Sequence, residues 1–226
     1  MPAFAFPLMI FAAGLGTRMG ALTASRPKPL LPVAGRAMID HALDMAAEAG
    51  VERIVVNTHY LADQMSDHLS GRGVAISHEP EILETGGGLR AALPHLGPGP
   101  VAVLNSDAIW TGRNPLTQLA EVWQGARMEA LLLLRQQPMA DFRLDSAGRI
   151  DRGHGGEDHL YLGACIFAPD RLADVPEAKF SLNRPWDAMI AAGTAYGVVH
   201  QGGWCDVGRP DGIAEAERLL HDAAHG

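Results

Sequence analysis

The chain has 226 residues, a length that suits one domain and leaves little room for an independent second one. With 47% hydrophobic and 19% charged residues it can bury a core, unlike a disordered protein. Its net charge of −8 argues against nucleic acid or an anionic membrane surface as the main partner, but not against a small anionic substrate bound by a few local cations.

The cysteine content and the apolar N-terminal segment indicate in which cellular compartment the protein is expected. Two cysteines, Cys165 and Cys205, are too few for a disulfide framework, and without a secretory signal we expect a cytoplasmic protein. The apolar run over residues 3–13 contains Pro7, precedes the first basic residue, and is shorter than the about 20 residues of a membrane helix. We therefore expect a buried strand there, and no membrane partner.

Strands and helices are predicted to alternate through about residue 135, from continuous apolar runs and from apolar residues at helical spacing. The predicted strands are residues 8–12, 53–58, 74–77, 100–105 and 130–135, and the predicted helices are residues 38–49, 61–69, 87–96 and 115–123. Such alternation predicts right-handed crossovers, a mostly parallel sheet, and ligands at the carboxyl ends of its strands.

The remainder of the chain has shorter predicted elements. They are strands at residues 142–144, 150–151, 160–168 and 196–200, and helices at residues 182–192 and 213–223. No internal repeat and no proline- or serine-rich linker separates the two parts. We expect a single Rossmann-like α/β domain with a smaller subdomain in its second half.

A glycine-rich loop, residues 12–20, follows the first predicted strand. Glycines there let the backbone approach an anion and direct N–H groups at it. A dinucleotide-binding fold would start a helix in the loop and place an acidic residue about 20 positions later. Instead, residues 27–32 contain three prolines, which forbid a regular helix and predict an extended segment. No Gly-Lys-Ser/Thr sequence follows, so the loop is not that of a P-loop NTPase.

Two cations belong to these segments, Arg18 in the loop and Lys28 between the prolines. Arginine offers a fork for phosphate oxygens, and lysine offers a compact charge. The chain has 16 arginines but only two lysines, so a lysine at position 28 indicates a specific role. The alternative is that Lys28 is a solvated surface charge.

Two aspartates are candidate metal ligands. Asp107 follows the apolar strand predicted at residues 100–105, at the end where an open α/β sheet binds ligands. Asp206 lies in a short apolar segment between Trp204 and Val207. Either aspartate alone also fits a helix cap or a turn. A pair of them in a phosphate-binding protein suits Mg²⁺, which often takes one or two carboxylates together with phosphates and waters.

The two-part segment formed by residues 12–19 and 26–33 resembles the signature of the sugar-1-phosphate nucleotidyltransferase family. The resemblance extends through residues 84–88, 105–107 and 204–208, so it spans nearly the whole chain in the same order. Within the family, the short chain and its Leu-Glu-Thr-Gly-Gly-Gly segment are most similar to bacterial uridylyltransferases that act on N-acetylmuramic acid 1-phosphate in cell-wall recycling.

This resemblance implies a nucleotide-binding half, about residues 1–135, and a sugar-phosphate half, about residues 136–226, that supplies the second metal ligand. It implies Mg²⁺-assisted, in-line transfer of a nucleotidyl group from UTP to a sugar 1-phosphate, giving a UDP-sugar and pyrophosphate. Mannose or heptose 1-phosphate with GTP, glucose 1-phosphate with dTTP, and a non-catalytic sugar-nucleotide-binding module stay open as alternatives. We expect small-molecule partners only, no nucleic acid, and a monomer.

The resemblance also implies roles for individual residues. Arg18 and Lys28 are the expected catalytic cations, and Asp107 and Asp206 are the expected metal ligands. The expected nucleotide-binding residues are Ala12, Ala13, Gly14, Gly16, Thr17, Glu79, Thr85, Gly86, Gly87 and Ser106. The expected sugar-phosphate residues are Arg143, Gly163 and Asn183.

Three of these positions leave questions open. Glu79 is expected to recognise the base, with an ordinary exposed glutamate as the alternative. Ser106 replaces the commoner glycine and crowds the nucleotide, although its hydroxyl suits a ribose oxygen. The stretch over residues 149–154 lacks the lysine with which many relatives hold the sugar phosphate, so an arginine such as Arg143 or Arg152 is expected to replace it.

Overall fold

The computed structural model describes residues 4–153 and 157–225, so His154, in the stretch that lacks a lysine, lies outside the described residues. In the first half the predicted alternation of strands and helices is confirmed. Its strands are β1 (Leu8–Phe11), β2 (Pro32–Val33), β3 (Arg36–Ala37), β4 (Ile54–Thr58), β5 (Val74–His78), β6 (Val101–Asn105), β7 (Ala108–Gly112) and β8 (Ala130–Gln136). Its α-helices are α1 (Met38–Ala49), α2 (Ala62–Leu69), α3 (Glu84–Leu96) and α4 (Pro115–Val122).

The second half of the chain has seven of the described α-helices and strands, and its division from the first half as a subdomain stays a prediction. It contains β9 (Phe142–Leu144), β10 (Ile150–Arg152), β11 (Asp158–Phe167), α5 (Asn183–Ala191), β12 (Ala195–Val199), β13 (Gly202–Asp206) and α6 (Pro210–His225). In the described part of the chain, no helix has both the length and the apolar character needed to cross a membrane.

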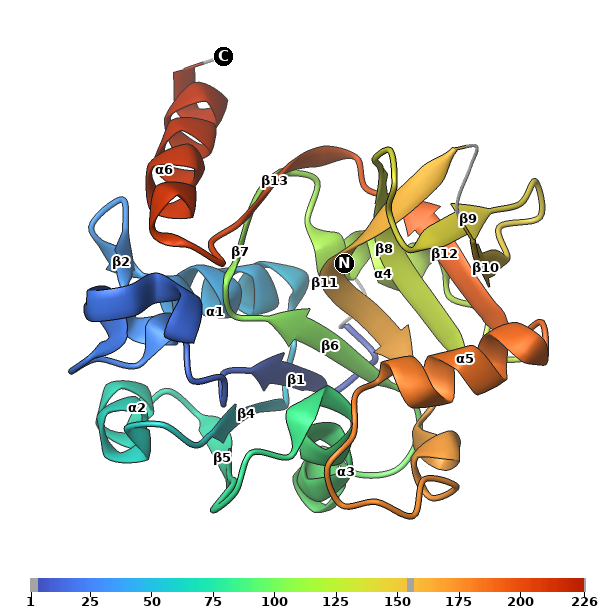
Figure 1. The fold of residues 1–226 in the computed structure, drawn as a ribbon, viewed down its shortest axis with the longest axis horizontal. Coiled ribbons are helices and arrows are strands. Elements are labelled where there is room, and N and C mark those ends of the chain that lie inside the picture. The colour runs from blue at the N-terminus through green and yellow to red at the C-terminus, as the bar shows by residue number, and fades with distance from the viewer. Residues whose placement is uncertain (1–3, 154–156, 226) are drawn as a thin grey trace.

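The main sheet runs in the order β10-β9-β11-β6-β1-β4-β5, and β8 and β12 branch from β11 (Figure 1). The strands β1, β4, β5 and β6 pair in parallel, as do β8 and β12, whereas β11 pairs antiparallel with β6, β8 and β9. The predicted α/β fold is therefore confirmed, with the antiparallel pairings gathered around β11 and the β9–β10 hairpin.

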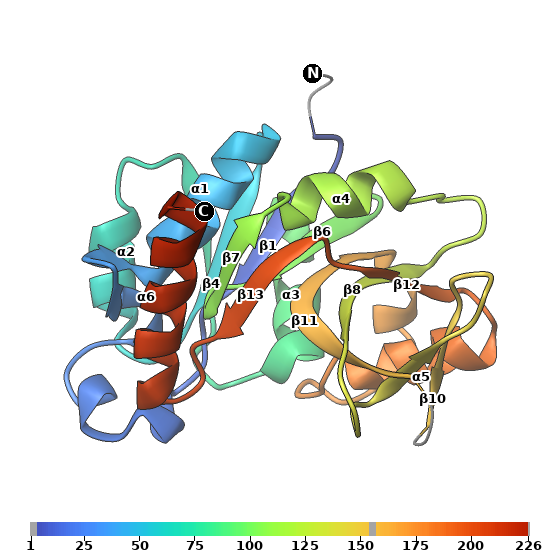
Figure 2. The same cartoon turned by 90° about the horizontal axis from the view of Figure 1, so that it is seen from above.

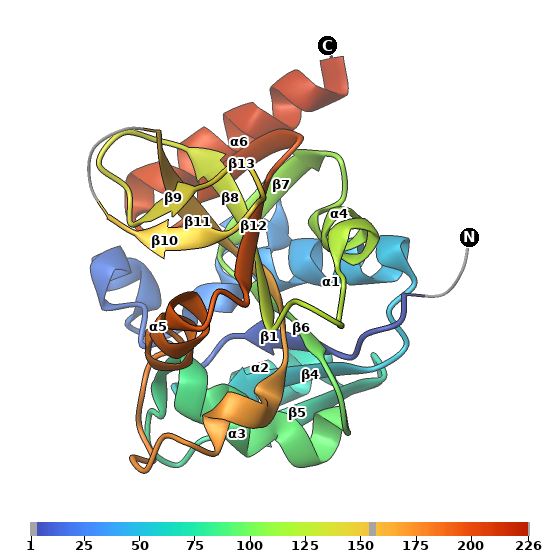
Figure 3. The ribbon, with the colours of Figure 1, turned by 90° about the vertical axis from the view of Figure 1, so that its right-hand side faces the viewer.

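Helices cover both faces of this sheet, as Figure 3 shows. The helices α1 and α4 pack on one face through Ile39 and Leu116, and α3 and α5 pack on the other through Leu89 and Met189. Because β1 is covered on both sides, its residues form a continuous apolar run rather than an alternating one. That burial is the physical reason why this strand was predictable.

We had predicted an extended proline-rich segment, and this prediction is only partly confirmed. Pro27 and Leu31 have extended backbones, but Lys28–Leu30 form a single 3₁₀ turn. In it the amide of Leu30 donates to the carbonyl of Pro27 at 2.9 Å, and the amide of Leu31 donates to that of Lys28 at 3.0 Å. Such a short turn needs only the N–H groups that the three prolines leave in place.

A two-stranded ribbon of β7 and β13 joins the two halves of the chain, beside α6 (Figure 2). Its antiparallel register sets Asp206 opposite Ala108, and the amide of Val207 donates to the carbonyl of Asp107 at 2.8 Å. The ribbon was not predicted, since its strands are short and lack an alternating pattern. Its consequence is that Asp107 and Asp206 become neighbours.

An ion-pair network joins Glu129, just before β8, to two segments of the second half. The carboxylate of Glu129 accepts hydrogen bonds from Arg171, at 2.9 Å from Nε and 2.7 Å from Nη2, and from the hydroxyl of Thr194. The network thereby ties the start of β8 to the segments that follow β11 and precede β12. The hydrogen bond from Arg171 lowers the pKa of Glu129, and that from Thr194 adds to this effect, against the opposing effect of burial.

We expect Glu129→Gln to lower the free energy of unfolding by about 1–3 kcal/mol at neutral pH, because Arg171 loses a charged acceptor. The folded-state pKa lies below the unfolded value, so this stabilisation is complete above the usual carboxyl pKa and is lost as pH falls through the folded pKa.

Urea unfolding of the wild type and of Glu129→Gln, at neutral pH and near pH 3, measures the difference in their free energies of unfolding. This difference is expected to be smaller at roughly pH 3 than at neutral pH. Glu121→Gln is the matched control, since Glu121 pairs with Arg113 on the surface with half of its side chain exposed. An equal difference at both pH values would contradict the stabilising role of the ionised Glu129 carboxylate.

Candidate active site

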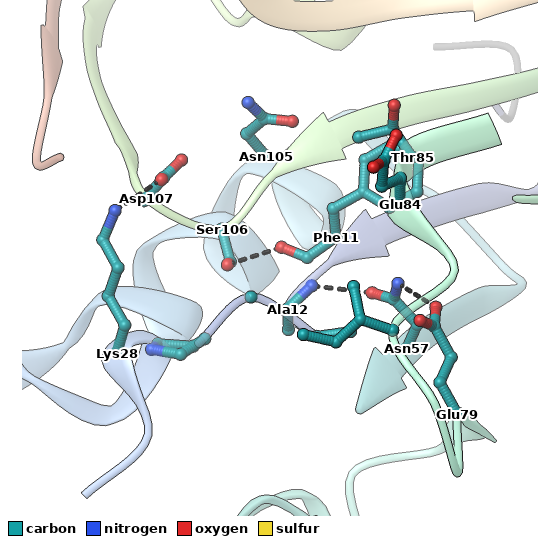
Figure 4. A pocket seen from close by; sticks show the side chains of 14 residues that line it. Phe11, Ala12, Lys28, Asn57, Glu79, Glu84, Thr85, Asn105, Ser106 and Asp107 are labelled. Atoms are coloured by element: carbon teal, nitrogen blue, oxygen red, sulfur yellow. Dashed lines mark hydrogen bonds and ion pairs between the residues drawn. The ribbon is translucent and has the colours of Figure 1, made fainter. Parts of the chain in front are cut away.

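A pocket lies at the carboxyl ends of β1, β4 and β6, where we had predicted ligand binding (Figure 4). Side chains from the glycine-rich loop, the proline-rich segment and the start of α3 share it. It is lined by Phe11, Ala12, Ala13, Gly14, Lys28, Pro29, Asn57, Glu79, Ile82, Glu84, Thr85, Asn105, Ser106 and Asp107. Six of the ten expected nucleotide-binding residues are in this lining, namely Ala12, Ala13, Gly14, Glu79, Thr85 and Ser106, whereas Gly16, Thr17, Gly86 and Gly87 are not.

The glycine-rich loop and the proline-rich segment pack against each other through Gly16. Gly16 has a left-handed backbone with φ 65°, and a Cβ there would lie 2.9 Å from the Cβ of Lys28. Thr17 then begins a 3₁₀ helix, Thr17–Thr23, which carries Arg18. A glycine at position 16 therefore permits the close approach that holds Lys28 beside the loop.

Lys28 and Asp107 form an ion pair at one end of the pocket, as Figure 4 shows. Nζ of Lys28 lies 2.6 Å from Oδ2 of Asp107, and only 10% of the lysine side chain is exposed. The alternative interpretation of Lys28 as a solvated surface charge is thus wrong. The pair connects the proline-rich segment to the end of β6.

Arg18 and Asp206 approach the same place from the other side, around Gly208. A Cβ on Gly208 would lie 2.6 Å from Oδ2 of Asp206 and 3.2 Å from Nη1 of Arg18. Desolvation raises the pKa of Asp206, and the negative charge of Asp107 raises it further, against the opposing effect of the nearby cations. Two cations and two carboxylates therefore gather beside this end of the pocket, whose lining includes Lys28 and Asp107 but not Arg18 or Asp206.

The two carboxylates are chemically suited to a hard divalent cation. The repulsion between Asp107 and Asp206 is a charge effect that a cation between them relieves. Within residues 4–153 and 157–225, no three His, Cys, Asp or Glu side chains are grouped as a metal site. Mg²⁺ suits such a sparse set, because it commonly completes its shell with phosphate oxygens and waters.

Glu79 and Asn57 lie at the opposite end of the pocket (Figure 4). Glu79 is 1% exposed, so the alternative of an ordinary exposed glutamate is wrong. Its carboxylate accepts from Nδ2 of Asn57 at 2.7 Å and from the amide of Leu83 at 3.0 Å, while Oδ1 of Asn57 accepts from the amide of Ala12 at 2.7 Å. Both oxygens of Glu79 have protein partners, and its contact with a base stays a prediction.

Two glycines near the start of α3, Gly86 and Gly87, pack against a segment of the second half. The amides of Gly86 and Gly87 both donate to the carbonyl of Phe180, at 2.9 and 3.0 Å. A Cβ on Gly86 would lie 2.4 Å from the ring of Phe180, and one on Gly87 would lie 2.3 Å from the carbonyl oxygen of Ala178. The structure thus places these two glycines against residues 178–180 rather than in the pocket lining, whereas the neighbouring Thr85 lines it. Their contact with a nucleotide stays a prediction.

Ser106 ties the ends of two strands together. Its hydroxyl donates to the carbonyl of Phe11 at 2.6 Å, and its amide donates to the same oxygen at 3.2 Å. The side chain is therefore already committed to joining β6 and β1. A further bond to a ribose oxygen stays a prediction.

Of the expected sugar-phosphate residues, Gly163 is the one that lies beside the pocket. It is in β11 with φ 86°, and a Cβ there would lie 2.8 Å from the side-chain nitrogen of Asn105, a lining residue. A side chain at position 163 would therefore displace Asn105. This geometry explains why β11 carries a glycine at the point where it passes the pocket.

Arg143 and Asn183 lie elsewhere in the second half. Arg143 lines a separate depression and is not among the pocket residues. Asn183 begins α5, where its side-chain oxygen accepts from Nη2 of Arg152 at 2.6 Å, and Nε of Arg152 pairs with Asp187 at 2.9 Å. The structure thus does not bring Arg143 into the pocket, and both residues' contacts with a substrate stay predictions.

Six residues of the pocket lining were not among the predicted site residues, namely Phe11, Pro29, Asn57, Ile82, Glu84 and Asn105. Asn57 and Asn105 are the polar uncharged ones, and Trp204, outside the lining, lies on β13 two residues before Asp206. An asparagine at the end of an apolar strand is the available signal for Asn57 and Asn105, because such a polar residue seldom belongs to a core. The position of Trp204 depends on the ribbon and had no signal of its own.

Comparisons with known proteins agree with this geometry. Residues 8–140 match the model of the MobA-like NTP transferase domain family. The chain is 40% identical to the N-acetylmuramate alpha-1-phosphate uridylyltransferase of Caulobacter vibrioides, over 95% of this chain and 97% of that protein. It is 33% identical to the enzyme of the same name from Neisseria meningitidis, over 93% and 96% of the two chains.

Two solved structures share the fold. HddC from Yersinia pseudotuberculosis, complexed with GMP-PN, has a TM-score of 0.79 at 20% identity, covering 95% of this chain and 99% of that one. A putative glucose-1-phosphate thymidylyltransferase from Bacillus anthracis has a TM-score of 0.82 at 18% identity, covering 96% of each chain. With the family model matching more than half of its length and close relatives matching nearly all of it, the chain belongs to the MobA-like NTP transferase family and is a sugar-1-phosphate nucleotidyltransferase.

Proposed function

We propose that this enzyme transfers the uridylyl group of UTP to N-acetylmuramic acid 1-phosphate, giving a UDP-sugar and pyrophosphate. The observation that carries the substrate assignment is the 40% identity, over almost the full length of both chains, to a uridylyltransferase of that specificity. The grouping of Arg18, Lys28, Asp107 and Asp206 supports the reaction, because phosphoryl chemistry depends on neutralising charge.

The reaction needs no general base from the protein. The sugar phosphate is already anionic near neutral pH, and its oxygen attacks the α-phosphorus in line. The work left to the enzyme is to position the two substrates and to neutralise their charges. This requirement agrees with a site built from cations and carboxylates.

The chain's own residues divide this work between them. Lys28 has three N–H donors, of which one meets Asp107, so two remain for phosphate oxygens. The guanidinium of Arg18 stabilises the charge on the departing pyrophosphate, and the amides of Gly14 and Gly16 face the phosphates. Mg²⁺ held by Asp107 and Asp206 would supply further positive charge to the phosphates of both substrates.

The substrate assignment is tested by a panel of UTP, GTP and dTTP against several sugar 1-phosphates, with pyrophosphate release as the measurement. We expect the highest kcat/KM for UTP with N-acetylmuramic acid 1-phosphate. A higher kcat/KM for GTP with mannose 1-phosphate, or for dTTP with glucose 1-phosphate, would replace the proposed substrates.

The charged groups are tested by Lys28→Ala and Asp107→Asn. Each is expected to lower kcat/KM by at least about 100-fold, the scale of losing one electrostatic stabiliser. Chelation of divalent cations is expected to abolish pyrophosphate release, and added Mg²⁺ to restore it.

Lys179→Ala is the matched control, since Lys179 is the other lysine of the chain and is 59% exposed. It is expected to keep the activity of the wild type. Near wild-type pyrophosphate release from Lys28→Ala or Asp107→Asn would rule out this use of the site.

Gly16→Ala tests how the loop holds Lys28. The added Cβ must displace the lysine stem, so kcat/KM is expected to fall about tenfold or more, as when a catalytic group is misplaced. Gly20→Ala is the control, because Gly20 also has a positive φ but a Cβ there meets nothing within 4 Å. Equal losses in the two variants would show that backbone strain alone is responsible.

A further inference from the structure

A bulge in β11 leaves a backbone carbonyl free for a side chain of the ribbon. The register of β11 with β8 breaks between Tyr161 and Cys165, and within this break the carbonyl of Leu162 accepts from the indole Nε1 of Trp204 at 2.9 Å. Trp204 is thereby held between β13 and β11. Because it precedes Asp206 by two residues in the same strand, the two side chains leave the same face of the ribbon.

The guanidinium of Arg135 lies over the ring of Trp204, with Cζ 4.9 Å from the ring centroid. Arg135 is the penultimate residue of β8, is exposed, and donates to the side-chain oxygen of Gln137 at 3.0 Å. Arg152 and Arg171 each pair with a carboxylate, whereas Arg135 has no ion pair with any described residue. Stacking on an indole orients the planar fork and leaves its charge available.

Arg135 lies over a residue that is two positions from Asp206 in the same strand. Residues two apart in a strand are separated by about 6.5 Å, which is similar to the width of a pyranose with its first substituents. A sugar that extended from Asp206 along the ribbon would reach Trp204 and Arg135. A guanidinium fork is matched to a carboxylate, which it binds through two parallel hydrogen bonds.

We infer that Arg135 binds the lactyl carboxylate of N-acetylmuramic acid 1-phosphate and so selects this sugar over its neutral counterpart. N-acetylglucosamine 1-phosphate has the same ring and phosphate but lacks the lactyl group. Lys28 and Arg18 serve the phosphates, and Arg135 serves the second anionic group of the sugar. This inference rests on the proposed function, whose acceptor is the sugar acid.

The test compares N-acetylmuramic acid 1-phosphate with its lactyl carboxamide, which keeps the shape and removes the charge. In the wild type, kcat/KM is expected to be about 10- to 100-fold higher for the acid than for the amide, the worth of a charged hydrogen-bonded pair. In Arg135→Gln this ratio is expected to fall to about 3 or less, because kcat/KM for the acid falls while kcat/KM for the amide stays nearly unchanged. Arg135→Lys, which keeps the charge without the fork, is expected to give an intermediate ratio.

Arg127→Gln is the matched control. The guanidinium of Arg127 also lies 4.9 Å from an aromatic centroid, that of Tyr196, but it precedes the opposite end of β8. This variant is expected to keep the wild-type ratio of acid to amide, and thermal unfolding of each variant confirms that it is folded.

The outcomes separate the two proposals. A wild type that uses the acid, together with an Arg135→Gln variant of unchanged acid-to-amide ratio, overturns the role of Arg135 and leaves the proposed function in place. Equal use of acid and amide by the wild type also overturns it. A wild type that does not turn over N-acetylmuramic acid 1-phosphate overturns the proposed function, and the inference with it.

Discussion

The ion pair between Lys28 and Asp107 holds together the two segments from which the site is built. Their side-chain atoms are 2.6 Å apart, with the lysine almost fully shielded from solvent. Burying two charges is costly, and the cost is offset only where the partners meet in good geometry. The left-handed Gly16 makes that geometry accessible by letting Lys28 pack against the loop. The free enzyme thus keeps a cation in place at the end of β6, in the lining of the pocket.

The ribbon of β7 and β13 extends this arrangement to the second half of the chain. Its register delivers Asp206 next to Asp107, and the same strand carries Trp204 toward the bulge of β11. One short strand therefore contributes both to the proposed metal-binding pair and to the surface over which the sugar is proposed to lie.

Much of the fold was predictable, because buried elements leave regular patterns. The continuous apolar run of β1 reflects burial of both faces of the strand. The helical spacing of apolar residues in α1 reflects burial of one side of the helix. The 3₁₀ turn at Lys28 and the ribbon were not predictable, since neither has a repeating pattern. The glycines at 86 and 87 illustrate a third case, in which a motif was recognised but its packing role depended on the distant Phe180.

The sequence by itself determined the chemical groups of the site and the class of the fold. Arg18 stands out in its glycine-rich loop and Lys28 between its prolines, and Asp107 and Asp206 stand out next to apolar segments, all of which are local properties of the chain. The tertiary structure decided which of the expected residues meet. It brought these four together, buried Glu79 against Asn57, placed Arg143 outside the pocket, and stacked Arg135 on Trp204. Contacts between residues far apart in the chain depend on strand register and packing, and a local pattern carries no record of either.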